Sequence, residues 1–564
     1  MSPKRFARFA PYLLLACGCS GAITAGSGPG GGIDPPGTGG GGGPPAGGGA
    51  CGATALAPAL HARMLLASQY DNTIADLFKV ASIAGPSGQV RPSDGFVGGF
   101  SSALDATAVG QRAAAAGAIA AQAAASVAAW SPCSTTACAP ALIEWVGLHV
   151  YRRPLAADEK SQLQALFDAG VKARDFQTGV DWLLTGALQS PDFLYQFARP
   201  IQGKAAGQVV ATPGYEMASR LSYFVWDSVP DDALFAAAGD PRALADARGV
   251  QDQVTRMMQD RQKLIRGVTG FYSDWLQAPD YLDLTRDDPM WSVDMAPSLW
   301  GSLLQTMTQP YSTATPNISS LLSGQSYPMN KTLRAFYGLS GAAGADWAPT
   351  EMPGENRRGL LTHPAFLSQM AKAAKTHPIN RGVFILNKLL CQDIKLPPNF
   401  NPPPTPDTNT VGVTTREETI SHTKPECAPC HDMIDPAGFA LENFNQVGRY
   451  RTKENGKDVD TSGTMNVSGP HGAPSDVKGV FAKGDDLLQK IAGSGDVKTC
   501  FAQQYFEHAV SGDVAPPGGV DPKDQCSVDG VSKAFAATGD LRSLIILIAT
   551  SDSFRFRTSE GVGP

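Results

Sequence analysis

The stretch FQTGVDWLLTGALQ, positions 176–189, shows the pattern that decides the fold class of this 564-residue chain. Its apolar side chains Val180, Leu183, Leu184 and Leu188 recur every three or four residues. This spacing places them on one face of an α-helix, because an α-helix has 3.6 residues per turn. The segment therefore predicts an amphipathic helix.

Similar patterns extend along the chain on both sides of this segment. Helices are expected at 111–130, 141–150, 157–169, 215–226, 231–237, 251–258, 264–276 and 541–550. Pro230 and Asp231 are residues that favour a helix start. Strand signals are scarce before the region 449–460, where Asn455-Gly456 predicts a hairpin turn. We therefore expect a mainly α, multi-module helical protein with a short β-hairpin.

The N-terminus has the pattern of an export signal. Three basic residues precede an apolar run at 9–16, which is too short to span a bilayer. The run ends in Leu14-Leu15-Ala16-Cys17, which is similar to a bacterial lipobox and predicts acylation of Cys17. The alternative is an ordinary cleaved signal peptide. No other apolar run approaches the roughly 18 residues of a membrane span, so we expect an exported lipoprotein of the outer membrane or cell surface without a transmembrane helix.

Composition supports a tethered globular protein. Residues 21–50 are dominated by Gly and Pro and predict a flexible tether behind Cys17. The rest of the chain contains enough apolar residues for several cores, at 43% overall. The net charge is −6 and no block of like charge stands out, so we expect no nucleic-acid partner. The membrane contact is expected through the N-terminal lipid alone.

The segment Cys427-Ala428-Pro429-Cys430-His431 carries the clearest chemistry. A c-type haem needs two thiols on one helical turn to bond its vinyl groups, and an imidazole on the next residue to reach the iron. A redox disulfide would need a thioredoxin-like strand before it, and a zinc site would need a second Cys/His pair nearby. Neither is present, so the segment predicts one haem c, with thioethers to Cys427 and Cys430 and an iron bond to His431.

Other side chains are candidates for the remaining haem contacts. Met465 follows a turn and has the thioether of a high-potential electron carrier, while His422 is the rival for the opposite iron position. Arg381 and Arg449 are candidate partners of the haem propionates. The weaker candidates for the iron are His471 and His508.

The other cysteines fit an oxidising compartment. Cys133 and Cys138 are close enough for a small loop disulfide. Cys500 and Cys526 flank one helical segment and its following loop, and form the second expected pair. Pairing of Cys51 with Cys391 follows only by elimination, since sequence does not fix disulfide geometry.

Several motifs resemble those of one known family. The segments that resemble its surface modules are QYDNTIADL (69–77), YRRPL (151–155), SPDFLY (190–195), ASRLSYFVW (218–226) and VPDD (229–232). The segments that resemble its cytochrome-type module are RGLL (358–361), PINRG (378–382), LLC (389–391), the haem segment and IDPAGFALENF (434–444). The chain resembles exported planctomycete- and myxobacterial-type surface proteins that combine planctomycete surface domains with a planctomycete cytochrome-type module.

The resemblance covers nearly the whole chain after the tether. Ala437 and Asn445 depart from the usual Leu and Asp of the family, but neither touches the haem attachment. The pattern of the N-terminus predicts a signal peptide at 1–16 and a lipidated Cys and tether at 17–50. The resemblance implies helical surface modules at 51–135, 136–200 and 210–330, a cytochrome c-like module at 331–470 and a C-terminal helical module at 471–564. The family has no settled activity, so the resemblance implies a haem-bearing surface protein without naming a reaction.

Two classes of function follow. The first is a lipid-anchored monohaem protein that transfers electrons, to a redox partner the sequence does not name, or performs haem-dependent redox chemistry at the cell surface. The second is a surface binding or scaffold protein, for example for polysaccharide, in which the haem is structural or regulatory. An open iron position would favour catalysis, whereas a Met or His ligand would favour electron transfer.

Overall fold

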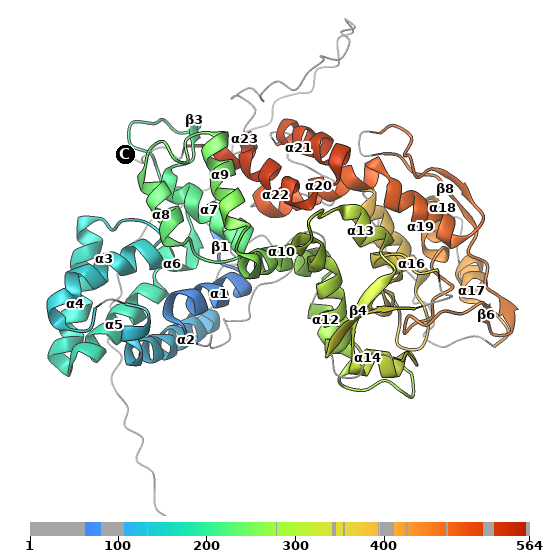
Figure 1. The fold of residues 1–564 in the computed structure, drawn as a ribbon, viewed down its shortest axis with the longest axis horizontal. Coiled ribbons are helices and arrows are strands. Elements are labelled where there is room, and N and C mark those ends of the chain that lie inside the picture. Colours follow the sequence, from blue (N-terminus) through green and yellow to red (C-terminus); the bar gives the residue numbers. More distant parts are fainter. Residues whose placement is uncertain are drawn as a thin grey trace, which may run out of the picture. The chain divides into compact units, whose positions relative to one another are not determined.

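The structure is a computed structural model (Figure 1). It describes residues 63–80, 106–131, 133–277, 279–340, 346–352, 356–392, 394, 411–422, 427–469, 472–510 and 524–559. Several predicted features lie outside these residues, namely the signal peptide, Cys17, the tether, Cys51 and His471.

The first group of helices packs around its own core. These helices are α1 (Ala67–Phe78), α2 (Ala106–Ala125), α3 (Ala139–Val150), α4 (Ala157–Ala173), α5 (Phe176–Gln189) and α6 (Pro191–Leu194), with the 3₁₀ turns η2 (Val127–Ala129) and η3 (Thr136–Cys138). Helix α5 packs against both α2 and α4. Its buried face includes Val180, Leu183, Leu184 and Leu188, the side chains that predicted this helix.

The second group begins with α7 and continues to the end of the described chain. The helices before the haem segment are α7 (Gly214–Trp226), α8 (Asp232–Gly239), α9 (Ala247–Met257), α10 (Arg261–Trp275), α11 (Pro279–Leu282), α12 (Met295–Thr308), η4 (Gln309–Ser312), α13 (Ile318–Ser323), α14 (Lys331–Phe336), η5 (Leu360–Thr362), α15 (Pro364–Gln369), α16 (Pro378–Phe384), the π-helical η6 (Ile385–Leu389) and α17 (Thr415–His422). The others are α18 (Ala428–Phe439), α19 (Gly484–Gly493), α20 (Gly495–Val510), α21 (Gln525–Thr538), α22 (Leu541–Thr550) and α23 (Asp552–Arg555). One continuous hydrophobic core runs through this group from Met217 to Phe554. The segments expected as modules at 210–330, 331–470 and 471–564 therefore share a core.

Strands are short, and those of the described residues form five antiparallel pairs. The pairs are β1 (Arg63–Met64) with β2 (Tyr195–Gln196), β3 (Val209–Ala211) with β10 (Phe556–Thr558), β4 (Ser326–Asn330) with β5 (Trp347–Glu351), β6 (Lys453–Glu454) with β7 (Lys457–Asp458), and β8 (Gly463–Met465) with β9 (Gly479–Phe481). The expectation of a mainly α protein is confirmed.

Two local predictions can be followed in detail. Asp231 caps α8, since its Oδ1 accepts a hydrogen bond of 2.9 Å from the N–H of Leu234. Between β6 and β7, Asn455 and Gly456 have φ angles of 49° and 85°. Two successive positive φ values are what a tight type I′ hairpin turn requires, and Asn-Gly adopts them most easily. Both predictions are confirmed.

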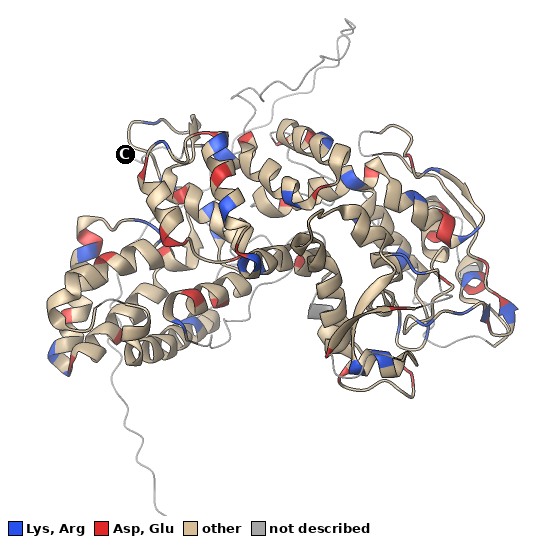
Figure 2. Cartoon of the chain, in the orientation of Figure 1, with Lys and Arg blue, Asp and Glu red and all other residues tan. Residues whose placement is uncertain are grey.

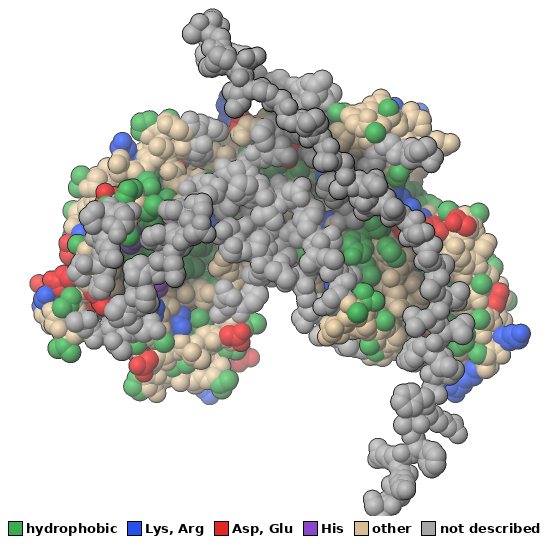
Figure 3. Space-filling view, turned by 180° about the vertical axis from the view of Figure 1, so that it is seen from behind, with side chains coloured by type: hydrophobic (Ala, Val, Ile, Leu, Met, Phe, Trp, Pro, Cys, Tyr) green, Lys and Arg blue, Asp and Glu red, His purple; other side chains and the backbone are tan. Residues whose placement is uncertain are grey.

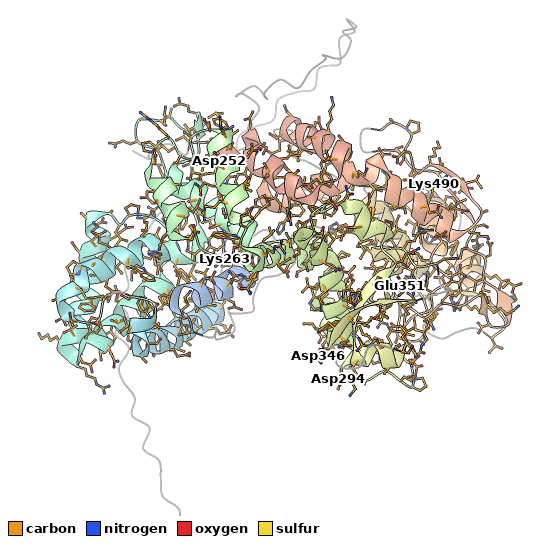
Figure 4. The ribbon with its side chains drawn as sticks, viewed as in Figure 1. Asp252, Lys263, Asp294, Asp346, Glu351 and Lys490 are labelled. Atoms are coloured by element: carbon orange, nitrogen blue, oxygen red, sulfur yellow. A yellow bond between two sulfur atoms is a disulfide. The ribbon has the colours of Figure 1, made fainter. Side chains whose placement is uncertain are left out.

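Charged residues of both signs are interspersed along the ribbon (Figure 2). Charged side chains such as Asp252 and Lys490 lie exposed on helices α9 and α19 (Figure 4). On the face drawn in Figure 3, apolar side chains occur in groups between polar ones. Among the described helices, none combines the length and the apolar character that crossing a membrane would require.

Candidate haem site

The predicted haem segment forms the first turn of α18. Cys427 is the residue that caps this helix, and the N–H of His431 donates to the Cys427 carbonyl at 3.1 Å. Residues three and four positions apart lie on the same side of a helix. Cys427, Cys430 and His431 therefore share one face of α18, and all three are half-buried. The local geometry places two sulfurs and one imidazole side by side.

The redox state of the cysteines separates this pair from the rest. Cys427 and Cys430 are free thiols. Every other cysteine of the described chain is disulfide-bonded, namely Cys133, Cys138, Cys391, Cys500 and Cys526. The two sulfurs of the haem segment are thus the ones that the fold leaves available for another bond.

The disulfides correct one part of the sequence prediction. Cys133 is bonded to Cys138, as expected. Cys500 is bonded to Cys391, so the expected pairs Cys500–Cys526 and Cys51–Cys391 are wrong. The reason is that α20 packs beside η6 and brings the Cα atoms of Cys391 and Cys500 to 5.5 Å. Cys526 is itself disulfide-bonded, to none of the other described cysteines.

A buried carboxylate holds the imidazole. Nδ1 of His431 and Oδ1 of Asp435, one helical turn later, are 2.9 Å apart. Asp435 is 7% exposed, and this burial raises the pKa of its carboxyl group, while His431 acts in the opposite direction. A hydrogen bond from Nδ1–H to a carboxylate fixes the tautomer in which Nε2 carries the lone pair. Sequence reasoning missed Asp435, although an acidic residue four positions after the histidine was a usable signal.

Helix α18 is held in place by close contact with α16. Gly382 of α16 lies against the carbonyl of Ile434, and Gly438 of α18 lies against the carbonyl of Pro378. A Cβ atom at either glycine would overlap that carbonyl oxygen. The two glycines therefore let the helices approach until their backbones touch, which gives α18 a rigid support.

Arg381 has a structural role and not the predicted haem contact. Its side chain is 0% exposed, and NH1 donates to the carbonyls of Leu441 and Phe444 at 2.9 and 3.0 Å. It also forms an ion pair of 3.1 Å with Glu442. A guanidinium enclosed in this way holds the chain after α18 against α16 and has no donor left at the surface. The prediction that Arg381 pairs with a propionate is therefore wrong.

Arg449 also has protein partners. Its NH1 lies 2.6 Å from Oδ2 of Asp288, and its NH2 donates to the carbonyl of Phe336 at 3.1 Å. The guanidinium lies over the Phe336 ring, at 4.2 Å from the centroid. These contacts hold the turn after α18 against α14. The Arg449 guanidinium, which was predicted to pair with a haem propionate, thus has a carboxylate partner within the protein.

The candidates for the second iron ligand lie in different surroundings. Met465 is 0% exposed, within the core on β8, a strand that contacts α18. His422 ends α17, and its side chain is outside the described part. His508 is buried in α20, where burial lowers its pKa to about 3, and its Nδ1 is 3.8 Å from Asp274. In the described ranges, no group of three or more His, Cys, Asp or Glu side chains gathers as a metal-ion cluster.

Comparison with known families assigns the chain. A family model described as PSCyt3, a protein of unknown function (DUF1588), matches residues 357–454, which contain α16, the haem segment and β6. Two further models, PSD4 (DUF1592) and PSD5 (DUF1595), also proteins of unknown function, match residues 213–339 and 138–197. The three matched ranges are planctomycete cytochrome-type domains. The expected family is thereby confirmed.

The planctomycete cytochrome-type module can now be related to the geometry. Its matched range runs from Arg357 to Glu454 of β6 and holds α16, η6 and α18, whereas β8, which also contacts α18, lies after it. The surface-domain matches cover α3 to β2 and α7 to α14. These domains support a haem-type surface protein. No curated protein and no solved structure matches the chain.

Proposed function

We propose that this chain is an exported protein that carries one haem c on α18 and uses it for electron transfer or haem-dependent redox chemistry at the cell surface. Cys427 and Cys430 supply the thioether bonds, His431 binds the iron, and a lipid on Cys17 is the anchor. The bound haem supplies a one-electron change of its iron. The observation that carries the proposal is the pair of free thiols beside His431. Every other described cysteine is in a disulfide bond.

The fold prepares these residues for the cofactor. The two thiols and the imidazole are half-buried and lie on one helical face, so the sulfurs would hold a haem and the imidazole would bind its iron. Asp435 holds Nδ1 and leaves Nε2 as the free nitrogen. The contact between α16 and α18 keeps this face from moving. The donor set therefore fits a covalently attached haem.

Met465 is assigned a packing role in this proposal. Its side chain is wholly buried in the core. It lies on β8, which pairs with β9 and contacts α18. The proposal therefore uses His431 as the iron ligand that the described chain supplies.

Haem attachment is tested by producing the chain in a host that matures exported c-type cytochromes. The purified chain is expected to keep its haem through denaturing electrophoresis, and its alkaline pyridine spectrum is expected to show one haem per chain. The Cys427→Ala/Cys430→Ala variant is expected to lose this denaturation-resistant haem completely, because no thioether can form.

A second histidine–aspartate pair provides the matched control for His431. Nε2 of His149 lies 3.0 Å from Oδ1 of Asp232, on α3 and α8. His149→Ala should leave the haem content unchanged, whereas His431→Ala should shift the absorption spectrum. A wild-type chain that gains no haem in this host, while a known exported cytochrome does, would refute the proposal.

Asp435→Asn is expected to raise the reduction potential of the haem by about 60–130 mV. The charged carboxylate makes His431 a more basic ligand, which favours the oxidised iron. A charge-assisted hydrogen bond contributes about 1.5–3 kcal/mol, and about 59 mV corresponds to a tenfold change for one electron. Potentiometric titration followed by absorbance measures the shift. Asp232→Asn, which alters the other pair, should leave the potential unchanged; an unchanged potential in Asp435→Asn would contradict the assigned role.

A further inference from the structure

A cavity of about 540 Å³ lies away from the haem segment. It opens where the range matched by PSD5 ends and the range matched by PSD4 begins. Four of the segments that resemble surface modules contribute to its lining, namely those at 69–77, 151–155, 190–195 and 218–226. Neither thiol of the haem segment nor His431 lines it. The cavity is thus a separate feature of the surface-domain part, and the proposed function makes no use of it.

Helix α7 supplies one continuous wall. The lining residues on this helix recur every three to four positions and so lie on one face: Tyr215, Glu216, Ser219, Arg220, Tyr223 and Phe224. The opposite wall is the segment 195–202, together with the turn 152–154. Arg63 of β1 and the end of α20 complete the lining. Elements far apart in the chain are therefore needed to form the cavity.

Two polar groups in this lining lack hydrogen-bond partners. Ser219 is 8% exposed, and its Oγ has no partner in the described structure. The Nε atom of Arg63 is likewise buried without a hydrogen bond. A buried polar atom that makes no hydrogen bond costs about 1–3 kcal/mol, so native proteins seldom leave one without a purpose. Both atoms belong to residues that line the cavity.

Three of the arginines that line the cavity contact acceptors of the protein itself. Arg152 donates to the carbonyls of Asp192 and Tyr195, at 2.7 Å each. Arg153 forms an ion pair of 3.1 Å with Asp192, and Arg199 pairs with the same carboxylate. These side chains join the turn 152–154 to the segment after α6. Their contacts hold this wall of the cavity together and occupy donors that a ligand would otherwise use.

Arg63 and Arg220 line the cavity and form no ion pair with a carboxylate of the described residues. Arg220 donates to Thr212 Oγ1 at 3.2 Å and lies over the Phe554 ring at 4.9 Å. Burial lowers its pKa to about 10, and the charges of Arg557 and Arg63 act in the same direction. The acidic groups acting on them are Glu216 and Asp524 for Arg220, and Asp274 and Asp227 for Arg63. Of these, only Glu216 lines the cavity, and it is paired with Arg557 at 2.8 Å.

The rest of the lining is largely aromatic. Tyr195 and Phe197 lie with their ring centroids 5.7 Å apart, and Tyr215, Tyr223 and Phe224 face them from α7. Flat apolar walls with a few convergent polar groups at one place are typical of sites for small organic molecules, whose volumes run to several hundred Å³. The volume of the cavity, its aromatic walls and the guanidinium groups of Arg63 and Arg220 together point to one class of ligand.

We propose that this cavity binds an organic acid with a planar, apolar body. Its carboxylate meets Arg63, Arg220 and the Ser219 hydroxyl, and its rings lie along the tyrosine and phenylalanine side chains. A carboxylate would supply the acceptors that Ser219 Oγ and Arg63 Nε lack. This inference goes beyond the haem proposal and stands or falls independently of it.

Calorimetric titration of the full chain with 2-naphthoate tests the inference. Saturable binding is expected, with 2-naphthalenemethanol, the uncharged analogue, bound at least tenfold more weakly, and acetate, the head group alone, also at least tenfold more weakly. Arg220→Gln should weaken 2-naphthoate at least tenfold, since a charged hydrogen-bond donor is lost. Ser219→Ala should weaken it about threefold and should fold normally, because Oγ has no protein partner to lose.

Arg242→Gln is the matched control, because Arg242 is an exposed arginine outside the cavity. It should bind 2-naphthoate like the wild type, and the haem absorption should not move during the titration. Equal affinity for the acid and the alcohol would overturn the inference in favour of a neutral ligand. The inference would also be overturned if 2-naphthoate showed no saturable binding. The same holds if the Ser219→Ala and Arg220→Gln variants both folded correctly and bound 2-naphthoate as tightly as the wild type.

Discussion

Replacing both Cys391 and Cys500 by alanine is expected to lower the free energy of unfolding by about 5 kcal/mol. The disulfide joins the end of η6 to α20 and closes a loop of 109 residues. In the chain-entropy description, a cross-link restricts the unfolded chain, and the effect grows with loop length to about 4.7 kcal/mol for 100 residues. Urea unfolding followed by tryptophan fluorescence under oxidising conditions measures the difference.

The chain contains its own control for this experiment. The disulfide Cys133–Cys138 has a sequence separation of only 5. The same relation gives about 2 kcal/mol for such a short loop, so Cys133→Ala/Cys138→Ala should cost less than half as much. Equal losses for the two double variants would contradict the loop-length argument. Alanine is used in both cases so that no new free thiol competes with Cys427 and Cys430 for haem.

Glu442→Gln is expected to cost about 3–5 kcal/mol of stability. The Glu442 side chain is 2% exposed and accepts hydrogen bonds from Thr376 at 2.6 Å, from Arg451 at 3.0 Å and from Arg381 at 3.1 Å. The amide would leave the buried charge of Arg381 without its counter-ion, and an uncompensated buried charge carries a penalty of this size. The unfolding midpoint in urea, with hydrogen exchange over residues 376–458, reports the loss and its location.

A double variant separates the charge effect from loss of packing. In Arg381→Met/Glu442→Leu both charges are absent, so this variant should be more stable than Arg381→Met alone, although the carbonyls of Leu441 and Phe444 still lose their donor. Asp252→Asn, an exposed carboxylate on α9, should change stability by less than about 0.5 kcal/mol. A Glu442→Gln loss no larger than that of Asp252→Asn would show that the ion pair does not hold this region.

Much of the local structure could be predicted because local residues decide it. Helix α5 has the bounds that its apolar spacing indicated, and α22 begins and ends where expected. Asp231 caps α8, and Asn455-Gly456 forms the hairpin turn. Each of these features depends on contacts between residues only a few positions apart, and such contacts can be inferred from the sequence directly.

Arg381 shows where this reasoning stopped. Arg381 stands in a short helix and resembles an ordinary surface arginine, yet Glu442, 61 positions later, encloses it in the core. Burial is a property of the whole packed chain, so this outcome could not be predicted from residues nearby.

The sequence by itself determined the helical class, the caps and turns, and the placing of two thiols and an imidazole on one helical turn. It also contained the pairing of His431 with Asp435, since four residues make one turn of α18. Only the tertiary structure decided the disulfide partner of Cys500, the burial of Arg381 and the cavity beside α7. The disulfide joins residues 109 positions apart, and Arg381 and Glu442 are 61 positions apart. Which segments meet depends on how all the apolar faces pack at once.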